Sequence, residues 1–163
     1  MIVPEGAIEL TLVRQGSTTY AQLKRDGVMH WHRPSVLLQQ FILPPDSVLH
    51  AMCYCDKNNK FKIGIFDTRR LHGMDHVRTP PLQRHIAVRT SMQQQCVDQI
   101  GMEFLWVCHE SACLDALKSP GTISGMQFRV KCIARLPQNI LQEATFERMM
   151  PPLLLSPEQS VLV

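Results

Sequence analysis

The chain of 163 residues is long enough to bury a hydrophobic core and short enough to form one domain. Its hydrophobic share of 45%, its charged share of 19% and its net charge of +3 are ordinary for a globular protein and permit anionic partners without requiring them. No run approaches the roughly 18 apolar residues that a membrane-spanning helix needs, so composition excludes a helical transmembrane protein.

The cysteines and the first residues together indicate the compartment. Residues 1–6 (MIVPEG) lack the basic and long apolar regions of a signal peptide. The six cysteines are therefore expected to be reduced thiols, mostly buried as small hydrophobic side chains, in an intracellular protein. If such a protein meets a membrane, we expect it at the inner face, as a peripheral protein.

The first third of the chain alternates polar and apolar residues in two places. Residues 7–14 have the period of a strand and end in a turn at residues 15–17, and residues 28–32 repeat the strand pattern. Between them, residues 18–24 are expected to form a short helix, followed by a turn at Asp26-Gly27. Residues 35–43 fit either a strand or a helix.

A β-hairpin is expected in the middle of the chain. Residues 48–55 and 60–67 alternate, and the polar turn between them (DKNN, residues 56–59) contains asparagines, which tolerate positive φ. Residues 69–81 show little periodicity and contain Gly73, Pro80 and Pro81, so they are expected to form a long exposed loop.

Residues 84–108 have the pattern of a β-α-β unit. Residues 84–89 alternate as a strand does, and Thr90 or Ser91 then has the side chain that caps a helix. Apolar residues at intervals of four predict the helix, and the apolar run 104–108 predicts a second, buried strand.

The rest of the chain predicts a helix at 111–118, a strand at 126–136, a helix at 139–149 and a C-terminal tail at 151–163. Together these elements indicate a single compact α+β domain over residues 1–150, with antiparallel, strand-rich sheets packed against a few helices.

Cysteine and histidine residues fall in two groups, neither of which makes a site. Cys53 and Cys55 follow His50, and Cys113 follows Cys108 and His109, but neither group has the paired Cys-x-x-Cys spacing of a zinc site. Neighbours on the expected strand, such as Cys108 and His109, would point to opposite faces and could not act as a dyad. No Gly-rich phosphate loop is present. We therefore expect no metal, no cofactor and no catalytic residues.

A basic stretch is the strongest functional signal. Between residues 57 and 89 it has a balance of +6, in a chain whose total is +3. Such a surface suits the phosphates of RNA or of acidic lipids. Because no sequence-reading motif with interleaved aromatic residues is present, any RNA binding would be non-specific. The alternative is a solvated face without a partner. The candidate anion-binding residues are Lys57, Lys60, Lys62, Arg69, Arg70, Arg78, Arg84 and Arg89.

The order of these segments resembles that of the matrix proteins of non-segmented negative-strand RNA viruses, most of all the bornaviruses. The similar segments are Ile2-Val3-Pro4 with the strand after it, and residues 81–85 (PLQRH) with the elements that follow. Residues 40–45 (QFILPP) are similar to a segment of filovirus matrix proteins. The resemblance runs over roughly residues 2–107, and residues 111–163 have no counterpart in the shorter bornavirus protein.

The resemblance implies a non-enzymatic structural protein of the virion. Such a protein would form homo-oligomers, coat an acidic membrane surface from inside and bridge it to RNA or to the ribonucleoprotein. Two alternatives remain open. One is a nucleic-acid-binding transport module, similar to plant virus movement proteins in having a strand that ends in Asp67-Thr68-Arg69. The other is an intracellular thiol enzyme or effector.

Overall fold

The computed structural model describes residues 1–25, 28–32, 42–98, 101–105, 107–118 and 130–136. The elements, in chain order, are β1 (Ile2–Pro4), β2 (Ile8–Gln15), β3 (Thr18–Arg25), β4 (Val28–His32), β5 (Ser47–Cys55), β6 (Phe61–Leu71), β7 (Met74–Asp75), α2 (Pro81–Asp98), β8 (Met102–Phe104), α3 (Glu110–Lys118) and β9 (Val130–Ile133).

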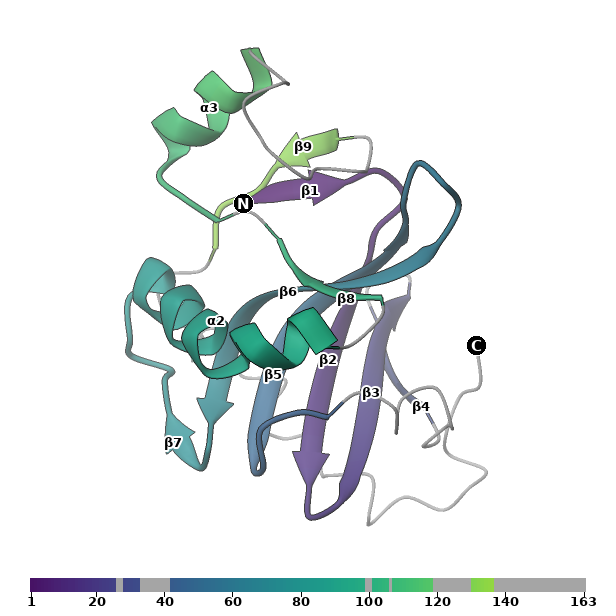
Figure 1. Cartoon of the computed structure of the whole chain (residues 1–163), viewed down its shortest axis with the longest axis vertical. Helices are drawn as coiled ribbons and strands as arrows, with labels where there is room; N and C mark the ends of the chain where they lie inside the picture. Colours follow the sequence, from purple (N-terminus) through teal and green to yellow (C-terminus); the bar gives the residue numbers. More distant parts are fainter. Residues whose placement is uncertain (26–27, 33–41, 99–100, 106, 119–129, 137–163) are drawn as a thin grey trace.

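A seven-stranded sheet forms the body of the protein. Its strands follow the order β4-β3-β2-β5-β6-β7, each antiparallel to its neighbour, and β8 runs parallel to β6. Helix α2 crosses in front of β5 and β6 (Figure 1). A mostly antiparallel sheet packed against a helix confirms the α+β class that the sequence predicts.

The main hydrophobic core lies between α2 and one face of this sheet. Side chains that alternate along β2, β5 and β6 point to that face, because successive residues of a strand point to opposite sides. Val88 and Met92, one turn apart on α2, pack on them. The strand residues in this core include Leu10, Leu12, Leu49, Ala51, Ile63 and Ile65.

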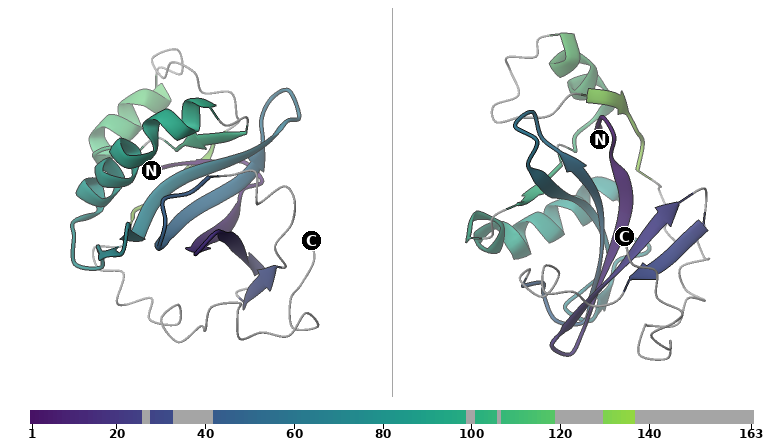
Figure 2. Two further views of the ribbon diagram at one scale, coloured as in Figure 1. Left: turned by 60° about the horizontal axis from the view of Figure 1, so that its bottom comes forward. Right: turned by 90° about the vertical axis from the view of Figure 1, so that its right-hand side faces the viewer.

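A second, smaller core covers the other face near one end of the sheet. There β1 pairs with β9, and α3 lies beside this pair, beyond the end of the main sheet (Figure 2). Met52 and Tyr54 of β5, which alternate with the residues of the main core, contact Ile2 and Leu105 in this cluster. The second core therefore holds the N-terminal strand, β9 and α3 to the main sheet, on the face opposite the main core.

Several predicted elements are confirmed. The strands at 7–14 and 28–32 are β2 and β4, and the hairpin is β5–β6 with its turn at residues 56–59. The helix at 111–118 is α3. The strand expected at 126–136 is present as β9, over Val130–Ile133.

The strand predicted at 84–89 is wrong, because these residues lie inside α2. The helix begins at Pro81, where proline is well suited to the first helical position, and not at Thr90 or Ser91. Its buried face contains Arg84, His85, Val88 and Met92, which recur at helical spacing. Two of these buried residues, Arg84 and His85, are polar. The buried face of the helix is therefore not recognised in the sequence when polar residues are assumed to face solvent.

Three further expectations are corrected. Residues 18–24 form β3, not a helix, because β3 pairs with β2 over residues 18–23 and with β4 over residues 21–25. The loop expected at 69–81 contains the end of β6 and the short strand β7. The strand expected at 104–108 ends at Phe104 as β8. The turn at 26–27, most of the segment 35–43, the helix at 139–149 and the tail at 151–163 lie outside the described residues.

Candidate anion-binding surface

The structure divides the eight candidate cations into separate groups. Lys57, Lys60 and Lys62 lie at the turn of the β5–β6 hairpin, and we call them the tip lysines. Arg69 and Arg70 lie near the other end of β6, Arg78 follows β7, and we call these three the far-end arginines. Along β6, Lys62 and Arg69 are seven residues apart, about 23 Å at the usual rise of a strand, and Lys57 and Lys60 of the turn lie farther away. One continuous basic face is therefore not formed.

Arg84 is a structural residue and leaves the surface set. Its side chain is 0% exposed and forms a bidentate ion pair with Asp67, with Nε–Oδ1 and Nη2–Oδ2 distances of 2.8 and 2.9 Å. Its Nη1 donates to the Thr79 carbonyl at 2.7 Å. All three guanidinium nitrogens of Arg84 already have partners within the protein, so they cannot bind an external phosphate. The assignment of Arg84 to anion binding is therefore corrected.

Acidic residues lie close to the far-end arginines. Arg70 makes an exposed ion pair with Asp46 at 3.4 Å and stands opposite Asp75 in the β6–β7 pair. Arg69 is half-buried, and Arg78 is exposed. The local charge is therefore lower than the sequence count suggests, because Asp46, which is distant in sequence, joins this end of the sheet.

The hairpin tip has a fixed backbone. The Asp56 carboxylate accepts hydrogen bonds from the backbone N–H groups of Asn58 and Lys60, at 2.8 and 2.9 Å. Asn59 has a φ of 61°, in the left-handed region that asparagine tolerates. The carboxylate is thus occupied by the turn, while Lys57 and Lys60 are exposed beside it.

An aromatic residue lies between the tip lysines. Phe61 is 48% exposed although it begins a strand whose inward residues are fully buried. Ile8, 40% exposed, lies on the same face of the sheet, since Ile8 pairs with Cys53 and Phe61 pairs with Cys55. The end of the hairpin therefore combines lysines with exposed apolar side chains, and it projects beyond the rest of the sheet (Figure 1).

Arg89 belongs to neither group. It is exposed on α2, and its guanidinium carbon lies 5.8 Å from the centre of the Phe104 ring, within cation–π range. The same ring contacts His85 edge-on, with centroids 6.5 Å apart. Arg89 therefore helps to hold β8 against α2.

Burial shifts the protonation of two histidines in the sheet–helix region. Burial lowers the pKa of His85, although its bond from Nδ1–H to the Phe66 carbonyl, at 2.8 Å, acts in the opposite direction. Burial also lowers the pKa of His50, where Asp67 acts in the opposite direction. Both imidazoles are therefore neutral parts of the interior and add no charge to the basic surface.

The first cysteine and histidine group is dispersed by the sheet. Cys53 lies in the main core, where burial raises its pKa, and Cys55 is exposed. His50 is an odd number of residues away along β5 and therefore points to the other face. Among the described residues, no group of three or more cysteine, histidine or acidic side chains is placed to hold a metal ion.

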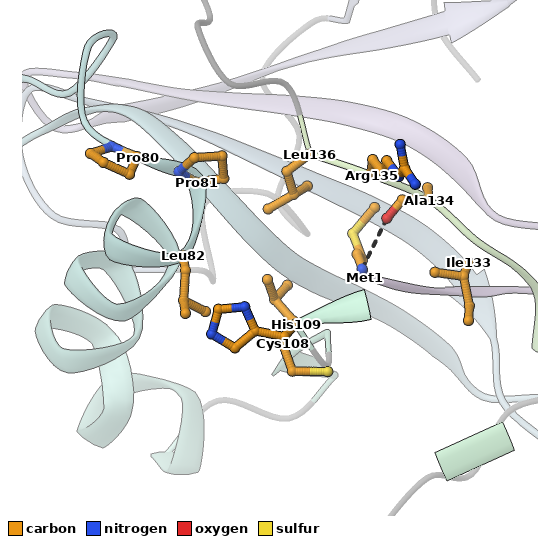
Figure 3. A pocket seen from close by; sticks show the side chains of 11 residues that line it. Met1, Pro80, Pro81, Leu82, Cys108, His109, Ile133, Ala134, Arg135 and Leu136 are labelled. Atoms are coloured by element: carbon orange, nitrogen blue, oxygen red, sulfur yellow. Dashed lines mark hydrogen bonds between the residues drawn. The ribbon is translucent and has the colours of Figure 1, made fainter. Parts of the chain in front are cut away.

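Two members of the second group, Cys108 and His109, line an open pocket of about 480 Å³. The start of α2, residues 107–109 and residues 133–136 form its walls, and the Met1 amine donates to the Ala134 carbonyl at 2.9 Å on one side (Figure 3). Both residues lie outside any strand, so the strand predicted for them from the sequence is corrected. The thiol partner of Cys108 is Cys113, whose Sγ lies 2.8 Å away.

Three features of these sites could have been seen in the sequence and two could not. The Asp-x-x-Asn turn and Phe61 between two lysines are visible in the printed chain, as is the Cys-x₄-Cys spacing of Cys108 and Cys113. The pairing of Arg84 with Asp67 depends on the tertiary fold because helix α2 has to meet β6 first. The pairing of Arg70 with Asp46 depends on β6 lying beside the start of β5.

Comparison of the chain with protein-family models, with curated proteins and with solved structures finds no match. The resemblance to viral matrix proteins therefore rests on the sequence pattern. Part of that pattern, the strand at 84–89, is helical in the structure. The helices in the described part of the chain include none that is long and apolar enough to cross a membrane.

Proposed function

We propose that this protein is a non-enzymatic, matrix-like structural protein that binds an acidic lipid surface through the tip of the β5–β6 hairpin. The observation that carries the proposal is the position of Phe61. It is half exposed between Lys60 and Lys62, at the projecting end of a hairpin whose turn is fixed by Asp56.

Lysines around an exposed aromatic residue suit a membrane surface. The lysines would contact the anionic headgroups, and the aromatic ring would lie at the boundary between headgroups and acyl chains. A cation near an anionic leaflet contributes about 1 kcal/mol, and the effect falls off within a Debye length. An exposed aromatic ring gains free energy by leaving water for the boundary between headgroups and acyl chains. A rigid turn loses little conformational entropy on binding.

The far-end arginines contribute less in this proposal. Asp46 and Asp75 lie beside them and offset their attraction for phosphate. Arg69 lies nine residues from Lys60, about 30 Å along the strand, so a flat membrane that meets the tip end-on would not reach the far-end arginines. This end of the sheet remains available for the ribonucleoprotein side that the matrix resemblance implies.

The test is sedimentation with phosphatidylcholine vesicles, with and without phosphatidylserine, at low and high salt. Replacing Lys57 and Lys60 with alanine should weaken binding to the acidic vesicles by about 2 kcal/mol, roughly thirty-fold, and reduce the salt dependence. Phe61→Ser should weaken binding with little change in salt dependence. The matched control replaces Arg69 and Arg78, two cations at the opposite end, with alanine and should have a smaller effect.

Equal loss in the tip variant and the far-end control would contradict the proposed orientation. Absence of acidic-vesicle binding by the unmodified protein would contradict the membrane function. Light scattering across concentration tests the self-assembly that a matrix protein requires, and a strict monomer on vesicles as well as in solution would argue against it.

A nucleic-acid-binding transport module is the second candidate, and the far-end arginines favour it. Guanidinium groups suit phosphate binding, and the described residues at this end include no exposed phenylalanine, tyrosine or tryptophan side chain, although Met74 of β7 is 65% exposed. Binding to single-stranded RNA that is lost in the Arg69→Ala/Arg78→Ala variant, together with no binding to acidic vesicles, would support this function over the first.

A further inference from the structure

Cys108 and Cys113 form a close thiol pair at the wall of the pocket. Their Sγ atoms are 2.8 Å apart, and the S–S distance in a disulfide bond is about 2.0 Å. Cys108 is half-buried and lines the pocket, and Cys113 is fully buried in the second core (Figure 3). One thiol is therefore open to a small molecule, and the other lies directly behind it.

Local structure brings the two sulfur atoms together. Helix α3 begins two residues after Cys108, and the Cys113 N–H donates to the His109 carbonyl at 3.1 Å in the first turn. This turn directs the Cys113 side chain back toward the residue before the helix. The pair therefore depends on one helical turn, and on the core that buries Cys113, rather than on a contact between distant segments.

We propose that Cys108 and Cys113 are a reversible thiol–disulfide site, oxidised by a low-molecular-weight disulfide such as oxidised glutathione that enters through the pocket. Cys108 is the thiol attacked first, and Cys113 is the resolving thiol. The proposal is independent of membrane binding and concerns a different part of the molecule from the hairpin tip.

The exchange balances in two steps. The Cys108 thiolate attacks one sulfur of the glutathione disulfide, which forms a mixed disulfide and releases one glutathione thiolate. The Cys113 thiolate then attacks the Cys108 sulfur, which forms the Cys108–Cys113 bond and releases the second glutathione. The protein loses two electrons and the two thiol protons, and oxidised glutathione takes up both electrons.

Burial and the hydrogen bond with Cys113 raise the pKa of Cys108 to about 12. Few Cys108 thiolates exist at neutral pH, so we expect slow oxidation that accelerates as the pH rises. Thiolates of high pKa are also poor leaving groups, which slows reduction of the product. Once formed, the bond would link α3 to the segment after β8 and fix one wall of the pocket.

The experiment equilibrates the full chain in glutathione buffers of increasing oxidised fraction, traps free thiols by alkylation and maps the peptides by mass spectrometry. The expected product is an intramolecular Cys108–Cys113 disulfide, about 2 Da lighter than the dithiol. Cys113→Ser should stop the reaction at a glutathione adduct on Cys108. The exposed thiol of Cys55 supplies the matched control, because Cys55→Ser should leave the Cys108–Cys113 bond unchanged.

A second measurement needs no variant. Phenylarsine oxide bridges two neighbouring thiols, so one equivalent should bind the reduced protein at Cys108 and Cys113 and prevent the disulfide. Separate glutathione adducts on both cysteines without a bond between them would overturn the proposal. So would a disulfide between other cysteines, or a pair that stays reduced in fully oxidised glutathione at alkaline pH.

Discussion

Arg84 and Asp67, 17 residues apart in the chain, form a bidentate ion pair with side chains that are 0% and 2% exposed. The pair joins the first turns of α2 to β6. Asp67 also accepts the Thr68 backbone N–H at 2.8 Å, and Arg84 also donates to the Thr79 carbonyl. One arginine of the basic stretch is thus part of the framework that positions the helix.

Replacing Arg84 with methionine should lower the free energy of unfolding by about 3–5 kcal/mol, because it leaves the Asp67 carboxylate buried without its counter-ion. The double variant Arg84→Met/Asp67→Leu should recover much of that loss, since no unpaired charge remains. Denaturant unfolding of the variants measures both. Arg70→Ala, which breaks the exposed pair with Asp46, is the control and should cost at most about 1 kcal/mol. A double variant less stable than either single variant would contradict this account.

Gly64 in β6 leaves space for the second core. A Cβ atom at this position would lie 2.6 Å from Cδ2 of Leu105 and 3.1 Å from Cε1 of Tyr54. Gly64→Ala should therefore destabilise the protein by about 1–3 kcal/mol through overpacking. The cost should shrink in a Leu105→Ala background, where the clashing side chain is gone, although that background is itself destabilised. Equal costs in both backgrounds, measured by denaturant unfolding, would show that Leu105 is not the obstacle.

The buried histidines should make the protein less stable as the pH falls. The folded-state pKa of His85 lies below its ordinary value of 6.5, mainly because of burial. Above that value both states are neutral, and below it the unfolded chain takes up the proton first, so stability falls as the pH drops from about 6.5 toward the folded-state pKa. The burial of His50 acts with the same sign.

His85→Asn should reduce this loss of stability between about pH 7.5 and pH 5.5, because it removes one titrating group and keeps a donor for the Phe66 carbonyl. Unfolding free energies at both pH values measure the effect. His72→Asn is the matched control, since His72 is exposed and asparagine tolerates its φ of 51°. An unchanged pH dependence in His85→Asn would remove His85 from the explanation.

The carboxylate of Asp56 should contribute both to the free energy of unfolding and to the rigidity of the hairpin turn. Asp56→Ala removes the acceptor of two backbone N–H groups and should cost about 1.5–3 kcal/mol. Amide hydrogen exchange should become faster at Asn58 and Lys60 in that variant. Asp56→Asn keeps one acceptor oxygen and should cost less. Unchanged exchange at both amides in Asp56→Ala would show that the carboxylate does not fix the turn.

The sequence by itself determined the elements whose pattern is local. Strands β2, β4, β5 and β6 alternate with the period of two that half-buried strands require, and the turn at 56–59 has residues suited to a hairpin. The spacing from Ser111 to Lys118 likewise marked α3. These predictions are confirmed because each depends on neighbours along the chain.

Only the tertiary structure decided which polar residues are inside. Arg84 and His85 are buried because Asp67 and the Phe66 carbonyl, both on β6, meet them there, and without those partners the same residues indicate a solvent-facing strand. The separation of the tip lysines from the far-end arginines has the same origin. Charge counted along a sequence ignores the length of a strand, whereas the extended β6 places the two ends of one basic stretch at opposite ends of the sheet.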